Sequence, residues 1–303
     1  MVSILIPAYN AEKTIQRCLD SVCMQTYKNI EVIVVNDGSA DGTADIAERY
    51  SAKCDYIRVI SQDNAGVATA RNVCLKEANG DFILFVDADD WIEPDMIERM
   101  LALCGDADIV FCGSDHAENS AEIKRSKPGE PEVWDQQRQQ LEFMKHQRMT
   151  GMLWNKMIRR SVTEGCCFNP ETGYGEDAEF LWQVLKKSKK MLVTDEILYH
   201  HVLEASSISH LPFSEKKYSA IPMWERINRE VEQKYPELLL FARERLTCAA
   251  GFSLYECKMS NYKNDRQISQ MRTIVRKNMS IILYSDSISL KFKIFILVAA
   301  IGV

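Results

Sequence analysis

The first 112 residues alternate short β-branched and aliphatic runs with segments of helical periodicity, and this alternation restricts the fold more than any other feature. It is typical of a parallel β-sheet whose faces are covered by the helices that connect its strands. We expect strands over residues 3–6, 30–35, 56–61, 82–86 and 108–112. We expect helices between them, over residues 11–25, 43–52, 66–78 and 94–103. The predicted fold class is α/β, with a Rossmann-like, mostly parallel sheet.

The pattern after residue 112 is less regular. Residues 114–140 are polar and lack hydrophobic periodicity, which predicts a surface excursion. We expect residues 141–160 to be helical in parts, residues 176–187 to form a helix and residues 191–201 a strand. From residue 206 to about residue 277 the chain is amphipathic, so a helical C-terminal extension is predicted.

The composition excludes several classes of protein. With 303 residues, 46% of them hydrophobic, the chain can bury a large core, and its net charge of -6 argues against a nucleic-acid partner. The ten cysteines include no C-x-x-C pair, which favours reduced core thiols in the cytoplasm over disulfides or a zinc site. The first residues do not have the pattern of a secretory signal, and no apolar run reaches the roughly 20 residues of a membrane span.

Polar turns follow three of the predicted strands, at residues 7–10, 36–39 and 87–91. The carboxyl ends of parallel strands share one edge of the sheet, where ligands bind in folds of this kind. We therefore expect the three turns to converge on one cleft. Taken alone, residues 36–39 are better interpreted as a tight turn that leads into the next helix, and residues 62–66 are ambiguous.

Asp87, Asp89 and Asp90 directly follow the apolar run 82–86. Three carboxylates within four positions repel one another unless a positive charge lies nearby. Oxygen ligands suit Mg²⁺ or Mn²⁺ better than zinc, so a divalent-cation site is predicted here. The alternative is a solvated turn in which one aspartate caps a helix. A second Asp-x-Asp triplet, at residues 106–108, precedes a strand and is interpreted as an exposed turn.

Several motifs together resemble those of the family 2 glycosyltransferases, which have the GT-A fold. In order, the matching segments are SILIPAYN (3–10), CLDS (18–21), QTY (25–27), VVNDGS (34–39), NAG (64–66), ARN (70–72) and FVDADDW (85–91). Their order and spacing agree with the family over residues 1–112. Weaker similarity continues through LWNK (153–156), ED (176–177) and SSIS (206–209).

The resemblance implies roles for specific side chains. Those expected to bind a nucleotide-sugar donor are Pro7, Ala8, Tyr9, Asn10, Asp37, Asn64, Arg71, Asp87, Ala88 and Asp89. Asp89, together with Asp87, would hold the metal, and Asp90 could share that role. Residues 1–112 would form the donor-binding half of the GT-A domain and residues 113–204 the acceptor half with the catalytic base. Residues 205–303 would form a helical region that ends in a basic amphipathic tail.

Asp177, in the pair Glu176–Asp177, matches the catalytic base of the family. Transfer of a sugar requires an acceptor hydroxyl to lose its proton as it attacks, and one positioned carboxylate can accept that proton. A metal ion can stabilise the negative charge that grows on the departing phosphate. With one base opposite the leaving group, the displacement inverts the anomeric carbon. The alternative is the first turn of a helix, where the dipole favours acidic residues, and both can hold at once.

Four further side chains could belong to the site. Lys156 could meet a diphosphate or lie on a solvated helix face. His200 and His201 end a predicted strand, where one of them could approach the metal or a phosphate, although histidines in such places are commonly structural. Trp91 could contact the acceptor or belong to the core.

The end of the chain differs in charge from the rest. Residues 1–204 carry 22 basic and 34 acidic side chains, and residues 205–303 carry 15 basic and 9 acidic ones. Residues 258–303, with eight basic and two acidic side chains, close on an apolar run that is expected to lie in an anionic membrane interface. The alternative is a helix packed on the domain or on a second subunit. Membrane contact would suit a polyprenyl-diphosphate-linked acceptor, so we expect a cytoplasmic protein on the inner face of the cell membrane.

These residues and the family resemblance together predict an inverting transferase, dependent on Mn²⁺ or Mg²⁺, that moves a sugar from a nucleotide diphosphate to a hydroxyl of a growing cell-surface glycan. The resemblance alone implies that the nucleotide is UDP. The alternatives are a sugar-phosphate nucleotidyltransferase and a non-catalytic homologue that binds glycan or nucleotide. Nucleotidyltransferases resemble one another in a Gly-rich, Arg-containing loop after the first strand, and residues 7–10 are not such a loop. A dehydrogenase is disfavoured because no G-x-G-x-x-G follows that strand.

Overall fold

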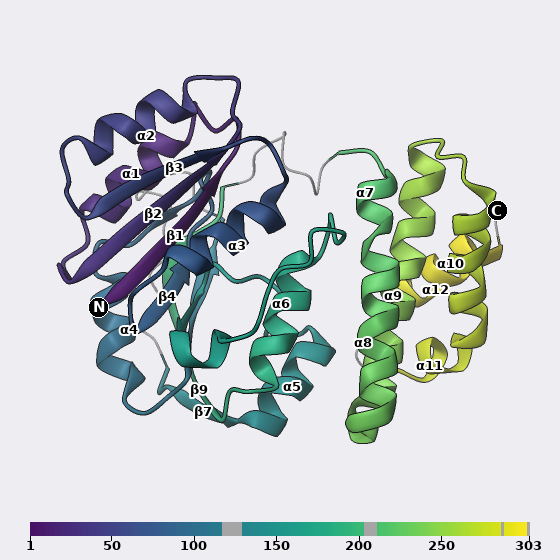
Figure 1. The fold of residues 1–303 in the computed structure, drawn as a ribbon. Helices are drawn as coiled ribbons and strands as arrows, with labels where there is room; N and C mark the ends of the chain where they lie inside the picture. The colour runs from purple at the N-terminus through teal and green to yellow at the C-terminus, as the bar shows by residue number, and fades with distance from the viewer. Residues whose placement is uncertain (117–128, 203–210, 286–287, 302–303) are drawn as a thin grey trace. The chain divides into compact units, whose positions relative to one another are not determined.

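The computed structural model describes residues 1–116, 129–202, 211–285 and 288–301, and these residues divide into two compact units (Figure 1). The first unit comprises Met1–Gln139, Met152–Pro170 and Phe180–Ala205. The second comprises Gln140–Gly151, Glu171–Glu179 and Ser206–Val303. The two units are interleaved in sequence.

A nine-stranded sheet forms the first unit, in the order β3-β2-β1-β4-β8-β6-β9-β5, with β7 also paired to β9. Its strands are β1 (Val2–Ala8), β2 (Ile30–Asp37), β3 (Ile57–Gln62), β4 (Phe82–Phe85), β5 (Trp91–Ile92), β6 (Ile109–Asp115), β7 (Glu132–Asp135), β8 (Lys156–Arg159) and β9 (Lys190–His200). Neighbours among β1 to β4 are parallel, β8 is antiparallel to β4 and β6, and β6 is parallel to β9. Six strands therefore share one direction, which confirms the mostly parallel sheet.

Helices cover both faces of this sheet. They are α1 (Ile15–Cys23), α2 (Thr43–Ser51), α3 (Val67–Glu77) and α4 (Met96–Cys104), with a 3-10 turn η2 (Arg160–Thr163) after β8. Val2, Ile4 and Ile6 of β1 are buried in one hydrophobic cluster with side chains of α1, α2 and α4. Leu5 alternates to the opposite face, which is the face on which α3 contacts β1 and β2 (Figure 1). Because both faces are covered, the sequences of the central strands are nearly continuous runs of apolar residues.

The surface excursion predicted for residues 114–140 is wrong in part, and its residues 117–128, like the motif at 206–209, lie outside the described residues. The expected surface excursion contains β7, which pairs with β9, and its end begins helix α5 (Gln136–Lys145). Within β7, Trp134 is buried and Val133 is exposed, but this alternation spans only four residues and gives a weak sequence signal. The prediction that residues 141–160 are helical in parts is confirmed by α5, and residues 156–159 form a strand that was not predicted, β8, between β4 and β6. The strands and helices expected before residue 112 are confirmed, and β5 is an additional two-residue strand.

The register of the parallel strands brings their carboxyl ends to one edge. Ala8, the last residue of β1, pairs with Asn36, and Asp37, the last residue of β2, pairs with Gln62. Leu5 pairs with Phe85, so the acidic turn that follows β4 begins beside the end of β1. The polar turns predicted to converge therefore share this edge of the sheet.

The second unit is helical at its C-terminal end, as predicted. Its helices are α7 (Glu215–Tyr218), α8 (Ala220–Lys234), α9 (Leu239–Met259), α10 (Asp265–Lys277), α11 (Met279–Tyr284) and α12 (Leu290–Ile301), with a 3-10 turn η4 (Pro236–Leu238) between α8 and α9. Helix α9 contacts α8, α10, α11 and α12, so it is the core of this bundle (Figure 1). Among the described helices, none has both the length and the apolar character needed to cross a membrane.

The last helix docks on α9 through a small residue. A Cβ atom added to Gly251 of α9 would lie 2.8 Å from Cγ1 of Ile296, so the absence of a side chain lets α12 approach closely. Ile296 is fully buried, and the ring of Phe295 lies 4.7 Å from that of Tyr255. One face of the apolar tail is therefore packed on its own unit, as the alternative interpretation of this segment expected.

Candidate active site

The turns after β1 and β2 are locked together by hydrogen bonds. The backbone N–H of Asn10 donates to Ser39 Oγ at 3.0 Å, and Ala40 N–H donates to Asn10 Oδ1 at 2.9 Å. Ala11 N–H donates to Thr43 Oγ1 at 2.7 Å. Asn10 has a φ of 48°, a left-handed conformation that asparagine adopts more readily than most residues. These contacts fix the shape of the sheet edge where the donor is predicted to bind.

Asp37 shapes the neighbouring loop after β3. Its buried carboxylate accepts hydrogen bonds from Gln62 Nε2 (2.7 Å), Ala65 N–H (2.9 Å) and Gly66 N–H (2.8 Å). Asn64 lies in this loop and is exposed. The contact of Asp37 with a nucleotide stays a prediction, because the described interactions give it a role in holding the loop.

The other predicted donor residues of the strand ends differ in exposure. Ala8 and Ala88 are buried, so only their backbone could face a ligand, whereas Pro7 is half-buried and Tyr9 is exposed. Tyr9 is therefore the side chain of this group that is most available to stack on a base.

Gly38 allows the turn after β2 to approach the loop after β3. It has a φ of 69°, and an added Cβ would lie 2.6 Å from the backbone nitrogen of Asn64. We expect Gly38→Ala to lower the free energy of unfolding by more than the roughly 1–2 kcal/mol that left-handed strain costs, measured by urea denaturation. Gly165→Ala is the matched control, since Gly165 has a φ of 71° and the nearest atom to its added Cβ, Nζ of Lys187, lies at an ordinary contact distance of 3.8 Å. Equal losses in the two variants would contradict the close approach.

The three carboxylates after β4 form one cluster. Asp87, Asp89 and Asp90 each present an oxygen, and these oxygens lie within 4.8 Å of one another. Burial, and after it the charges of Asp87 and Asp90, raise the pKa of Asp89 from 3.8 to about 7. Ionised carboxylates crowded in this way are stabilised by a hard divalent cation, so the donor set fits Mg²⁺ or Mn²⁺.

Asp90 links this cluster to the end of β9. It is fully buried, and its oxygens accept hydrogen bonds from the Tyr199 hydroxyl (2.6 Å) and Val202 N–H (2.9 Å). His201 Nδ1 lies 3.0 Å from Asp90 Oδ1, and this hydrogen bond raises the pKa of His201. The Tyr199 hydroxyl also accepts a hydrogen bond from Asp87 N–H at 3.1 Å. Asp90 therefore holds the acidic turn against β9 and leaves Asp87 and Asp89 as the more available ligands.

Two arginines bring positive charge to the same turn. Arg71 of α3 is buried and its Nη2 lies 3.2 Å from Asp87 Oδ1. Arg17 of α1 donates to the backbone carbonyl of Asp89 at 2.6 Å. Both contacts stabilise a turn that would otherwise be held open by carboxylate repulsion.

His200 has a structural environment. Its ring is fully buried, with Nδ1 2.6 Å from Asp115 Oδ1 and Nε2 3.2 Å from Glu93 Oε1. It stacks on Trp91 with the ring centroids 3.8 Å apart. Since both ring nitrogens have carboxylate partners, the placement favours the structural alternative for His200 and a core position for Trp91. His201, which is half-buried beside Asp90, is the histidine closer to the acidic cluster.

Lys156 also lies in the interior rather than on a ligand-binding surface. Its side chain is fully buried, and Nζ donates to the Met152 carbonyl at 2.7 Å and to Asn155 Oδ1 at 2.8 Å. The ammonium lies over the ring of Phe111. This environment does not support the predicted contact with a diphosphate.

The predicted base lies in the first turn of α6 (Glu176–Leu185), within the second unit. Asp177 is half-buried, and its Oδ1 accepts a hydrogen bond from Ala178 N–H at 3.0 Å. Glu176 is buried. The place of this pair in a first helical turn is confirmed, and the role of Asp177 as the base stays a prediction.

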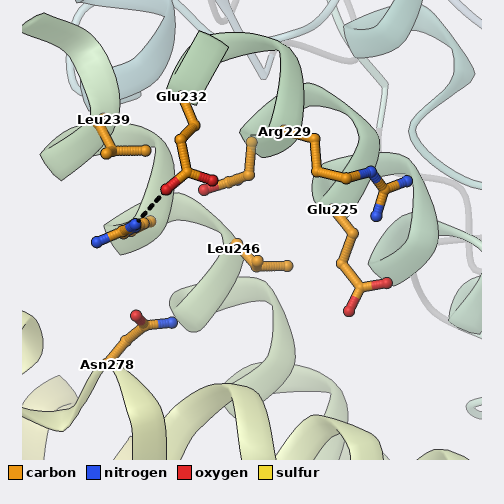
Figure 2. Close-up of a pocket in the computed structure, with 8 residues that line it drawn as sticks. Glu225, Arg229, Glu232, Leu239, Leu246 and Asn278 are labelled. Atoms are coloured by element: carbon orange, nitrogen blue, oxygen red, sulfur yellow. Dashed lines mark hydrogen bonds and ion pairs between the residues drawn. The ribbon is translucent and has the colours of Figure 1, made fainter. Parts of the chain in front are cut away.

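A shallow pocket of about 200 Å³ lies in the second unit among α8, α9 and the residue before α11 (Figure 2). Glu232 and Arg243 form an ion pair of 2.8 Å in its wall, and the lining also contains Glu225, Arg229 and Leu246 (Figure 2). Carboxylates and guanidinium groups alternate around it, so it favours neither an anion nor a cation.

Sequence reasoning missed the residues that organise the cluster from a distance. Tyr199 precedes the two histidines, but nothing local indicates that its hydroxyl would bridge Asp87 and Asp90. Asp115, at the end of β6, could have been noticed as another acid after a strand. Its pairing with His200 depends on the parallel register of β6 and β9.

Comparison with known proteins agrees with this architecture. The sequence model described as "Glycosyl transferase family 2" matches residues 3–166. EpsH of Bacillus subtilis (strain 168) is 36% identical over 213 residues, which cover 68% of this chain and 62% of EpsH, so the chain spans less than two thirds of that relative. The crystal structure of S. aureus TarS 1–349 in complex with UDP-GlcNAc superposes with a TM-score of 0.71 at 22% identity, over 98% of this chain and 86% of TarS.

A second structure supports the same fold. The mannosyltransferase PcManGT from Pyrobaculum calidifontis, in complex with GDP-Man and Mn²⁺, superposes with a TM-score of 0.60 at 15% identity, over 99% of this chain and 86% of that protein. These likenesses confirm the predicted GT-A fold. The family model covers more than half of the sequence, and the chain therefore belongs to glycosyl transferase family 2.

Proposed function

We propose that this protein is an inverting, metal-dependent glycosyltransferase that uses a nucleotide-diphosphate sugar, with UDP as the nucleotide, and a hydroxyl of a growing glycan as the acceptor. The observation that carries the proposal is the crowded pair Asp87 and Asp89 at the end of a parallel strand, in a chain of this family. TarS in complex with UDP-GlcNAc and PcManGT in complex with GDP-Man and Mn²⁺ support the class of donor and of cofactor.

The proposed chemistry assigns a separate task to each group. A divalent cation held by Asp87 and Asp89 would stabilise the negative charge that develops on the departing diphosphate. Arg71 holds Asp87 in place through its buried guanidinium, and Asp90 holds the turn through Tyr199. Asp177 would accept the proton of the acceptor hydroxyl as it attacks the anomeric carbon. Attack opposite the leaving group would invert that carbon.

The first test is a calorimetric titration of the purified protein with UDP, GDP, CDP and dTDP, each with Mn²⁺ and with EDTA. We expect UDP to bind in the presence of Mn²⁺ and to lose most of its affinity in EDTA. Mn²⁺-dependent binding of GDP alone would show that the donor is a GDP-sugar rather than a UDP-sugar, and it would still support the metal site. Equal affinity for UDP in Mn²⁺ and EDTA would contradict the assignment of the carboxylates as metal ligands.

We also propose that the protein acts at the inner face of the cell membrane on a polyprenyl-diphosphate-linked glycan of a capsule, exopolysaccharide or lipopolysaccharide. The support is the outer face of α12, where Leu290, Ile294 and Val298 are exposed and spaced by four residues, so they share one side of the helix. Lys291 and Lys293 flank this apolar stripe. An apolar stripe beside cations is typical of helices that lie in anionic interfaces.

Charge reversal in α12 is expected to weaken membrane binding. Each lysine near an anionic surface contributes about 1 kcal/mol, so Lys291→Glu with Lys293→Glu should lower the affinity for phosphatidylglycerol vesicles by roughly tenfold or more, measured by flotation. Lys53→Glu with Lys76→Glu changes the net charge equally on exposed positions of the first unit and should have little effect. A wild-type protein that does not bind these vesicles, or equal losses in the two double variants, would refute the proposed surface.

A further inference from the structure

The segment that carries Asp177 is closed by a network centred on Arg226 of α8. Arg226 donates from Nε to Glu179 Oε1 at 3.0 Å, and from Nη2 to the same oxygen at 2.7 Å. The same Nη2 donates to Thr172 Oγ1 at 2.9 Å, and the Thr172 hydroxyl donates to Glu179 Oε2 at 2.6 Å. The hydroxyl therefore accepts one hydrogen bond and donates another, which uses its single proton and one of its lone pairs.

The network joins residues that lie on both sides of Asp177 in the sequence. Thr172 precedes Asp177 by five residues and Glu179 follows it by two. Arg226 holds both residues, so it ties the loop before α6 to the first turn of that helix. Arg226 thereby holds together the two ends of residues 172–179, the segment that contains Asp177.

Two further contacts anchor the same segment on α7 and α8. Tyr174 N–H donates to Ser219 Oγ at 3.0 Å. Gly175 has a φ of 90°, and an added Cβ would lie 2.8 Å from Cε of Met223. The backbone just before Asp177 therefore lies directly on the helical bundle.

We propose that Arg226 is a positioning residue for the base, so that helix α8 of the C-terminal region sets the place of the Asp177 carboxylate. This inference rests on the proposed role of Asp177 as the base. A carboxylate accepts a proton only within hydrogen-bond reach of it, and a misplacement of about 1 Å can cost about 10²-fold in rate. The helical region is then part of the catalytic machinery rather than an appendage to it.

Arg226→Gln is the direct test. We expect it to lower kcat by roughly 10- to 100-fold, while the KM for the donor and the metal-dependent affinity for UDP stay within about twofold of wild type. Arg226→Lys keeps the charge but not the forked geometry, so it should recover only part of the lost turnover. Arg229→Gln, an exposed arginine three residues along the same helix, is the control and should leave kcat unchanged.

A double-variant cycle separates positioning from general stability. If Arg226 acts through Asp177, Arg226→Gln should have almost no further effect on the residual rate of Asp177→Asn. A loss by the same factor in both backgrounds would overturn the inference, because a structural role does not depend on the base. Full turnover of Asp177→Asn alone would instead refute the base assignment on which the inference rests.

A second variant keeps the test decisive if Arg226→Gln unfolds the protein. Thr172→Val removes the bridging hydroxyl and leaves the Arg226–Glu179 ion pair in place. We expect a several-fold loss of kcat with an unchanged KM for the donor and a thermal midpoint close to that of wild type. Wild-type kcat in Thr172→Val and in Arg226→Lys together would overturn the proposal.

Discussion

Replacing Asp177 with asparagine is expected to lower kcat by about 10²- to 10⁴-fold while donor affinity is retained. The amide has nearly the same shape as the carboxylate and can keep the hydrogen bond from Ala178 N–H, but it cannot take a proton from the acceptor hydroxyl. The loss should therefore fall on the chemical step. It is measured as the rate of nucleotide release with acceptor present, beside a calorimetric titration with UDP and Mn²⁺.

Glu171→Gln is the matched control for this prediction. Glu171 is an exposed carboxylate of the same loop, six residues before Asp177, and its amide variant changes the net charge equally. We expect its kcat to stay close to wild type. Turnover of Asp177→Asn at the wild-type rate would show that another group accepts the proton.

Replacing Asp89 with asparagine is expected to abolish most of the metal-dependent donor affinity. Loss of an outer-shell partner already costs about 10- to 100-fold in metal affinity, and loss of a direct ligand should cost at least as much. The comparison is the UDP affinity in Mn²⁺ and in EDTA, for the variant and for Asp63→Asn, an exposed aspartate near the same edge of the sheet. An Asp89→Asn variant whose UDP affinity still depends on Mn²⁺ would contradict the assignment.

The same carboxylate gives the metal site a dependence on pH. The pKa of Asp89 is raised from 3.8 to about 7 by burial and by Asp87 and Asp90, so protons compete with the cation below about pH 7. Metal-dependent UDP affinity should therefore fall as the pH is lowered through 7. Without metal, in EDTA, the stability of the folded protein should change with pH in the opposite direction to the UDP affinity. The folded state holds this proton more tightly than the unfolded state, so the contribution of Asp89 to stability decreases as the pH rises from about 4 to about 7.

Asp89→Asn should remove that part of the pH dependence. Thermal unfolding in EDTA between pH 5 and pH 8 is the measurement, and the variant should lose less stability than wild type as the pH rises. Identical pH profiles for the two proteins would show that Asp89 is ionised throughout this range.

The strands and helices up to residue 112 could be predicted because their patterns are long and local. Strands β1, β2 and β4 are apolar on both faces, and the helices between them have a clear periodicity. Strands β7 and β8 are four residues each, and β8 contains a lysine at its start. They are strands because their backbones form hydrogen bonds with neighbouring strands, and the local sequence gives no sign of these partners.

Some features of the candidate site could likewise be predicted from the local sequence, and others depend on residues that are distant in the chain. The acidic run of Asp87, Asp89 and Asp90 is visible in the sequence because mutual repulsion between adjacent carboxylates is a local property. Which of them is buried is decided by Tyr199 and His201, more than 100 residues away in the chain. The same holds for Lys156 and His200, whose residue types suggest ligand contacts but whose polar atoms are paired in the interior.

Three features could be predicted from the residues alone: the family, the segments that form the parallel strands, and the cluster of acids at one strand end. Each depends on short motifs or patterns along the chain. The folded chain was needed to see that Asp90 holds the turn while Asp87 and Asp89 stay available, and that Arg226 closes the segment around Asp177. This is because burial and hydrogen-bond partners assign the role of a charged group, and both are supplied by residues distant in sequence.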